Sequence, residues 1–183
     1  MKPQKKLTLA AVMSALGVVV MYVGALFQVL DLTSVALAAL LVILARIELG
    51  HPYDWLVYGV TGALTFILMV GVNPLIPVLY LLYVGMYPIL KAYIEQLPKA
   101  LILTVKTVYF AFICLLLVGL LALGARLLGV PLFEGEAAGY TVYLLIVIYI
   151  VAVAVSFVFD MLLTQLIVLY VRRVRPKIER IFR

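Results

Sequence analysis

Long runs without a charged residue are the feature that most restricts how this chain can fold. Leu7–Phe27 is the first of them, and at about 1.5 Å of rise per residue a helix over this run would cross the ~30 Å core of a bilayer. Across the whole chain 68% of the residues are hydrophobic and 12% are charged, whereas soluble domains average about 25% charged residues. The sequence therefore predicts an all-α integral membrane protein.

Six apolar runs can be delimited, and we expect each to form a membrane-spanning helix. They are Leu7–Phe27, Leu32–Ala45, Trp55–Val72, Leu75–Ile94, Leu101–Leu123 and Tyr140–Val171. No polar segment between them is long enough to fold outside the bilayer, so residues 1–183 should form a single six-helix transmembrane domain.

Three of these runs leave alternatives open. Leu7–Phe27 could be a cleaved signal peptide, although it exceeds the roughly 7–15 apolar residues usual in one. Leu32–Ala45 is short and could be a re-entrant or interfacial segment, and a full crossing requires Arg46 to extend toward the inner interface. Tyr140–Val171 would measure ~48 Å as one helix, so it should tilt or project beyond the bilayer.

The stretch Leu79–Lys106 sets the orientation. We interpret it as a helix bent near Pro88, a turn that carries Lys91 and Lys99, and a second helix with Pro98 in its first turn. Positive charge in short loops is retained on the cytoplasmic side. This turn is therefore expected to be cytoplasmic.

The remaining charges agree with that orientation. The N-terminus is basic, the tail Arg172–Arg183 is rich in arginine, and of the 14 Lys and Arg residues only Arg126 falls in the longest predicted outer loop, Gly124–Gly139. Both termini should thus lie in the cytoplasm, and the protein in the plasma membrane with several crossings. Topology and anionic lipid explain the net charge of +6 better than nucleic acid does, and we expect the tail to act as an anchor.

The residues typical of catalysis and metal binding are scarce. His51 is the only histidine and lies near Asp54 in a predicted loop, where we expect it to be solvated. Cys114 is the only cysteine, which excludes an intrachain disulfide and a cysteine metal site. The phosphate-binding loop G-x-x-x-x-G-K-[ST] is missing from the sequence. We expect no enzymatic activity, no cofactor and no metal site.

Two charged residues lie inside predicted spans. Lys106 is in the fifth and Asp160 in the sixth, and charges at membrane depth usually face the protein interior or water. They could form a proton or substrate-ion site. We favour an ion pair between the two helices, because both residues are expected in the cytoplasmic half of the bilayer.

The 12 tyrosines suggest a ligand site. Tyr80, Tyr83 and Tyr87 recur at three- and four-residue spacing, which places them on one face of a continuous α-helix. Tyr143 lies in the outer half of the sixth span, where an interfacial aromatic belt is the alternative. With Asn73 as a cap, these rings could line a pocket for a flat, mostly apolar small molecule, or they could simply pack the bundle.

Small residues on the first span carry a resemblance to a known family. Ala11-x-x-x-Ala15 forms a face that another helix can approach closely. With six spans, a basic N-terminus and both ends inside, this chain resembles the substrate-binding S component of energy-coupling factor (ECF) transporters. The resemblance implies that Ala11 and Ala15 contact a membrane coupling subunit, which two cytoplasmic ATPases drive, and that a small-molecule substrate binds near the outer side.

Two further expectations follow from that resemblance. The outer half has few charged or amide groups beyond Asn73, Asp31, Glu134 and Glu136, which argues against a highly polar substrate. Nickel or cobalt is also disfavoured, because His51 lies on the predicted inner side. The alternative is a small scaffold protein of an envelope-assembly complex, without transport activity, which binds its partners through helix faces and lipid through its basic tail.

Overall fold

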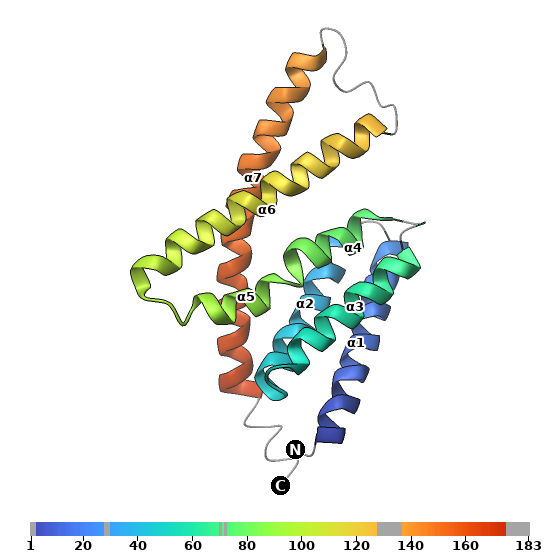
Figure 1. The fold of residues 1–183 in the computed structure, drawn as a ribbon, viewed down its shortest axis with the longest axis vertical. Helices are drawn as coiled ribbons and strands as arrows, with labels where there is room; N and C mark the ends of the chain where they lie inside the picture. The colour runs from blue at the N-terminus through green and yellow to red at the C-terminus, as the bar shows by residue number, and fades with distance from the viewer. Residues whose placement is uncertain (1–2, 28–29, 70, 72, 128–136, 175–183) are drawn as a thin grey trace. The chain divides into compact units, whose positions relative to one another are not determined.

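The computed structural model describes residues 3–27, 30–69, 71, 73–127 and 137–174, and all regular secondary structure in these ranges is helical (Figure 1). The elements are α1 (Pro3–Leu26), α2 (Asp31–Glu48), α3 (Tyr53–Met69), α4 (Leu75–Leu79), the π-helix η1 (Tyr80–Val84), α5 (Tyr87–Ile94), α6 (Lys99–Leu127), α7 (Ala137–Leu169) and the π-helix η2 (Tyr170–Val174).

Several helices are long and apolar enough to cross a membrane. They are Pro3–Leu26, Leu75–Ile94, Leu101–Gly124 and Val142–Arg173, and α3 is a shorter apolar helix. The prediction of an all-α membrane protein is confirmed at this level, because within the described ranges no strand occurs and the apolar runs are helical.

The chain divides into two compact units, and the first, Met1–Ile102, is organised around three neighbouring helices. α1 packs against α2 and α3, and α2 also packs against α3; α4, η1 and α5 join this group through contacts with α2 (Figure 1). The buried residues at the centre are small or β-branched: Ala10, Val35, Ala38, Ala39, Val42, Ala45 and Val57. Such side chains allow helices to approach closely where lipid supplies no hydrophobic driving force.

The second unit, Leu103–Arg183, contains most of α6 together with α7 and η2. Phe110 of α6 and Phe157 of α7 meet edge to face, with ring centroids 5.2 Å apart. Cys114 Sγ lies 3.7 Å from Ser156 Oγ, so the sole cysteine is buried against a hydroxyl. These contacts tie α6 to α7 within the unit.

Helices extend into segments that the sequence assigns to loops. Arg46 and Glu48 belong to α2, and Asp54 lies in the first turn of α3, so the predicted inner loop shrinks to Leu49–Pro52. In this turn Gly50 has φ 75°, a left-handed conformation that residues with a Cβ rarely adopt. The predicted outer loop Gly124–Gly139 is likewise shortened, because α6 continues to Leu127 and α7 begins at Ala137; its middle, 128–136, lies outside the described residues.

The predicted fourth span is helical from Leu75 to Ile94, but its hydrogen-bond pattern changes along the way. α4 passes into η1, a turn follows at Gly85–Met86, and α5 begins at Tyr87, so the α-helical pattern is interrupted in the turn just before Pro88. A Cβ on Gly85 would lie 2.7 Å from the Tyr80 ring, so only glycine leaves room for that ring. Pro88 occupies the first turn of α5, where its missing N–H needs no partner. The interruption therefore lies close to the bend predicted at Pro88.

Substitution of Gly24 tests the close contact between α1 and α2. An added Cβ would overlap Cβ and Oγ of Ser34, so we expect Gly24→Ala to lower the free energy of unfolding by about 1–3 kcal/mol. Gly59→Ala on α3 is the matched control, because a Cβ there meets nothing within 4 Å and alanine favours a helix. Thermal unfolding of both variants in detergent micelles measures the difference, and equal stability of the two would disprove the contact.

Candidate functional site

Helix α1 presents two stripes of small residues with different roles. The stripe containing Ala10, Ser14 and Gly17 is buried, and the Ser14 carbonyl accepts a hydrogen bond of 3.4 Å from the Thr61 hydroxyl of α3. Ala11 and Ala15 are both exposed. The first stripe therefore holds the unit together, whereas the Ala11/Ala15 face stays open.

The C-terminal ends of α1 and α3 and the N-terminal end of α2 meet at one end of the first unit. Here Asn73 Nδ2 donates a hydrogen bond of 3.3 Å to Asp31 Oδ2, and both residues are half-buried. The other carboxylate oxygen, Asp31 Oδ1, is buried and accepts no hydrogen bond from the described part of the chain. A buried carboxylate oxygen without a donor is costly, and a ligand with an N–H or O–H group could satisfy it.

The three tyrosines of the fourth apolar run occupy different environments. Tyr80 is fully buried, with its ring centroid 5.8 Å from that of Tyr58. Tyr87 is also fully buried, and Lys91 Nζ lies 5.9 Å from its ring centroid. Tyr83 is half-buried. Tyr80 and Tyr87 thus take part in the packed core of the first unit.

The sequence predicts one shared helix face for these tyrosines, and the structure changes the helical register between them. The π-helix η1 starts at Tyr80 and the chain turns at Gly85–Met86, so the 3.6-residue period does not hold between Tyr80 and Tyr87. The fifth candidate, Tyr143, belongs to α7 in the second unit and is 72% exposed.

The opposite end of the first unit holds a polar cluster that the sequence interpretation missed. Asp54, expected in a solvated loop, is completely buried in the first turn of α3. Its Oδ2 accepts a 2.6 Å hydrogen bond from Arg46 Nη1, and its Oδ1 lies 3.6 Å from His51 Nδ1. The sequence does contain a signal for this ion pair. Arg46 lies in the last turn of one helix and Asp54 in the first turn of the next, so the two side chains can meet across the turn.

Other basic groups gather at this same end. Lys6 Nζ donates a 3.0 Å hydrogen bond to the Leu49 carbonyl. Carbonyl groups at the end of a helix such as α2 lack a donor within the helix, and the lysine supplies one here. The same ammonium lies 5.7 Å from the Tyr53 ring centroid, and the Arg46 guanidinium lies 4.9 Å from that of Tyr93. Cation–π contacts and carbonyl acceptors stabilise charges at a partly buried site.

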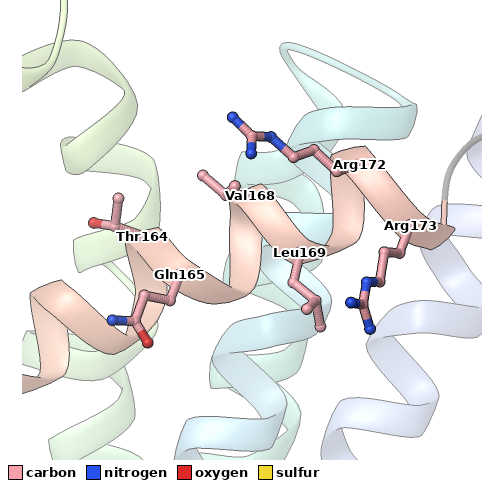
Figure 2. A pocket seen from close by; sticks show the side chains of 6 residues that line it. All are labelled: Thr164, Gln165, Val168, Leu169, Arg172 and Arg173. Atoms are coloured by element: carbon pink, nitrogen blue, oxygen red, sulfur yellow. The ribbon is translucent and has the colours of Figure 1, made fainter.

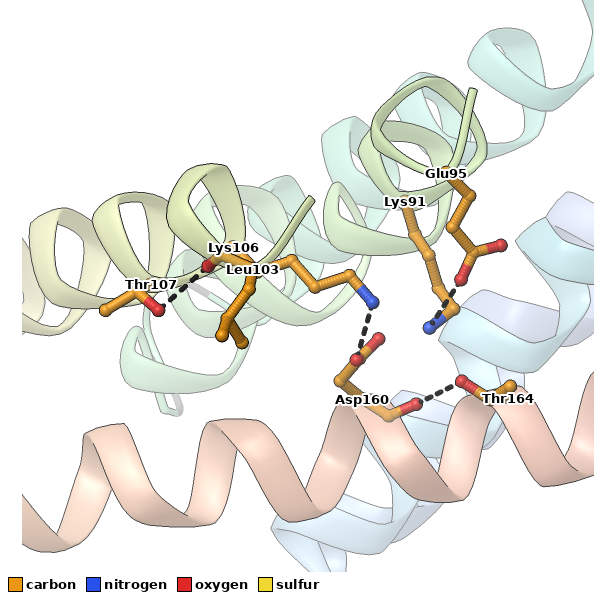
Figure 3. Close-up of polar contacts among 7 residues, drawn as sticks. All are labelled: Lys91, Glu95, Leu103, Lys106, Thr107, Asp160 and Thr164. Carbon is orange, nitrogen blue, oxygen red and sulfur yellow. Dashed lines mark hydrogen bonds and ion pairs between the residues drawn. The ribbon is translucent and has the colours of Figure 1, made fainter. Parts of the chain in front are cut away.

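In the second unit the structure brings Lys106 and Asp160 together. Lys106 Nζ lies 2.7 Å from Asp160 Oδ2, and the two side chains are 11% and 15% exposed (Figure 3). The Thr164 hydroxyl donates a hydrogen bond of 2.8 Å to the Asp160 carbonyl one turn earlier. Figure 3 also shows the pair of Lys91 and Glu95 in the first unit, 3.1 Å apart, at the four-residue spacing of helical ion pairs.

The side chains that could hold a metal ion do not form a cluster in the described part of the chain. Among the residues that the structure describes, no three His, Cys, Asp or Glu side chains are grouped so that they could hold a metal ion. The arrangement offers instead an open helix face, a carboxylate–amide pair at one end of the first unit and cations at the other.

Comparison with known proteins adds no relative. No protein-family model, curated protein or solved structure matches this chain. Function has to be inferred from the residues and their geometry.

Proposed function

We propose that this chain is the membrane-embedded substrate-binding subunit of an ATP-driven, ECF-type uptake transporter. It crosses the plasma membrane six times with both termini in the cytoplasm. A membrane coupling subunit binds its first helix, and cytoplasmic ATPases supply the energy. The observation that carries the proposal is the open Ala11/Ala15 face of α1.

This face has the properties that a docking helix needs. The neighbouring stripe, Ala10 and Ser14, already supplies the close contacts of α1 with α2 and α3, so Ala11 and Ala15 are not required for internal packing. Without a bulky side chain at these two positions, a partner helix can approach the α1 backbone and gain van der Waals contact. An interface formed in this way can dissociate without unfolding the subunit.

The charge distribution of the first unit supports the orientation. Lys6 and Arg46 lie at the end that also holds the α2–α3 turn, whereas Asp31 and Asn73 lie at the other end. Because cations are retained on the cytoplasmic side, the Asp31–Asn73 pair faces outward. The substrate enters from that side.

The Asp31–Asn73 pair suggests the chemistry of the substrate. Asp31 Oδ1 requires a donor, so the substrate carries at least one N–H or O–H group. Few other charged or amide groups lie at this end of the first unit, so we take the remainder of the substrate to be largely apolar. A small, mostly apolar compound with one polar end fits both requirements.

Bulky substitutions on the two stripes of α1 test the docking face. Ala11→Trp or Ala15→Trp is expected to abolish copurification of the ATPase-containing module, while the stability of the purified variant changes by no more than about 0.5 kcal/mol. Ala10→Trp should do the opposite, because Ala10 is fully buried and overpacking costs about 1–3 kcal/mol or more. Thermal unfolding and quantitative mass spectrometry of the copurified proteins measure the two effects.

Ala63→Trp provides the matched control, since Ala63 is an exposed alanine on α3. This variant should retain both stability and partners. Unfolding of the isolated Ala11→Trp protein would show that the face belongs to internal packing and would remove the proposal's main support. Copurification with envelope-assembly proteins but no ATPase would favour the scaffold function instead.

A further inference from the structure

A groove runs along the C-terminal turns of α7 and into η2, and the transport proposal does not use it. Its volume is about 360 Å³ (Figure 2). Six residues line it: Thr164, Gln165, Val168, Leu169, Arg172 and Arg173. We refer to it as the α7 groove.

The residues of the α7 groove form two parallel rows. Figure 2 shows Thr164, Val168 and Arg172 along one side of the helix and their sequence neighbours Gln165, Leu169 and Arg173 along the other. Four-residue spacing aligns Thr164 with Val168 and Gln165 with Leu169 on α7, and Figure 2 shows Arg172 and Arg173 continuing the two rows into η2. Each row thus passes from a polar residue through an aliphatic residue to an arginine, over roughly 12 Å of helix rise.

The charge of the groove has one sign. Arg172 and Arg173 are both exposed, and residues 161–174 contain no aspartate or glutamate. The carboxylate that precedes them, Asp160, forms an ion pair with Lys106. Within the described ranges neither arginine has an ion pair, so both guanidinium groups can bind an anion.

We take α7 to be tilted in the bilayer, which places the groove, at the C-terminal end of the apolar stretch Val142–Arg173, in the headgroup region. Arg172 and Arg173 come at the end of the apolar stretch Val142–Arg173, where an apolar helix leaves the hydrocarbon core. Long basic side chains at such positions reach the phosphate level. Val168 and Leu169, roughly one turn deeper, lie at the level where acyl chains begin.

We propose that the α7 groove is a binding site for one anionic phospholipid. Arg172 and Arg173 hold the phosphate through charge-assisted hydrogen bonds, for which the planar guanidinium is well suited. Val168 and Leu169 contact the first part of an acyl chain, and the Gln165 amide donates to an ester carbonyl. A zwitterionic lipid binds more weakly because its ammonium group faces two positive charges, and free phosphate leaves the aliphatic part of the groove unused.

The test uses the full-length protein in detergent micelles, titrated with dioleoylphosphatidylglycerol and, separately, with dioleoylphosphatidylcholine. Native mass spectrometry counts the bound lipids. We expect one phosphatidylglycerol to be retained in preference to phosphatidylcholine. Each basic residue near a lipid surface contributes about fivefold in affinity, so Arg172→Gln/Arg173→Gln should weaken phosphatidylglycerol binding about 30-fold.

Two further variants distinguish a site from general attraction by positive charge. Lys2→Gln/Lys5→Gln removes two charges from the other terminus and should leave the preference unchanged. Val168→Trp keeps every charge but fills the groove, and Val168 is exposed, so the protein should fold and yet lose the bound lipid.

Three results would overturn the proposal. One is a loss of phosphatidylglycerol from the lysine variant equal to that from the arginine variant. The second is undiminished binding by Val168→Trp. The third is displacement of the lipid by millimolar inorganic phosphate, which would identify a site for free phosphate.

Discussion

Arg46→Met is expected to lower the free energy of unfolding by about 3–5 kcal/mol. The reason is the carboxylate that it leaves behind: the Asp54 side chain is completely buried, and Arg46 Nη1 is bound to its Oδ2 at 2.6 Å. Without the guanidinium, a charge would remain in the interior with only His51 nearby, or would have to take up a proton. Thermal or denaturant unfolding of the purified protein measures the loss.

His51→Gln is the matched control for the same carboxylate. His51 Nδ1 lies 3.6 Å from Asp54 Oδ1, and the His51 side chain is 60% exposed, so its removal should cost no more than about 1 kcal/mol. In the double variant Arg46→Met/Asp54→Leu no buried charge is left, and most of the lost stability should return. Similar losses for Arg46→Met and His51→Gln would mean that Asp54 does not depend on Arg46.

Lys106→Met and Asp160→Leu should each cost about 3 kcal/mol, and the double variant should recover at least half of the summed loss. The two charged atoms lie 2.7 Å apart, and both side chains are largely buried within predicted spans. Each single change leaves an unpaired charge where water is scarce, whereas the double change leaves two apolar residues. A double-mutant cycle of unfolding free energies measures the coupling.

The control for this cycle is Lys5→Met, which removes the same kind of charge as Lys106→Met but at an exposed position. Lys5 is exposed in the first turn of α1, so its removal should shift stability by no more than about 0.5 kcal/mol. If the losses from Lys106→Met and Asp160→Leu simply add in the double variant, the two residues are not coupled. Retained stability combined with lost substrate uptake in either single variant would instead assign the pair to transport.

The sequence was sufficient to predict the class of the protein and most of its helices. Runs such as Leu7–Phe27 and Leu101–Leu123 carry their own signal, because length and hydropathy are properties of a contiguous segment. The pairing of Lys106 with Asp160 could also be anticipated, because two charges in otherwise apolar spans have few other ways to be stabilised.

Helix ends and interruptions were predicted less well. The charges of Arg46 and Asp54 suggested a loop, yet both residues lie in helices, because their ion pair makes the buried position tolerable. An interruption of the fourth span near Pro88 was predicted, but not the role of Gly85, which leaves room for the ring of Tyr80. For Arg46 and Asp54 a contact between two helices decided the local structure.

The amino-acid sequence by itself determined that this chain is a helical membrane protein and where its apolar runs lie, since both follow from transfer of contiguous side chains into lipid. Only the tertiary structure decided which small-residue stripe of α1 is buried. Ala10 and Ala11 are chemically identical neighbours, and the packing of α2 and α3 covers one and leaves the other exposed. It also decided that Asp31 meets Asn73, because such contacts depend on how separate helices are placed, which no local period encodes.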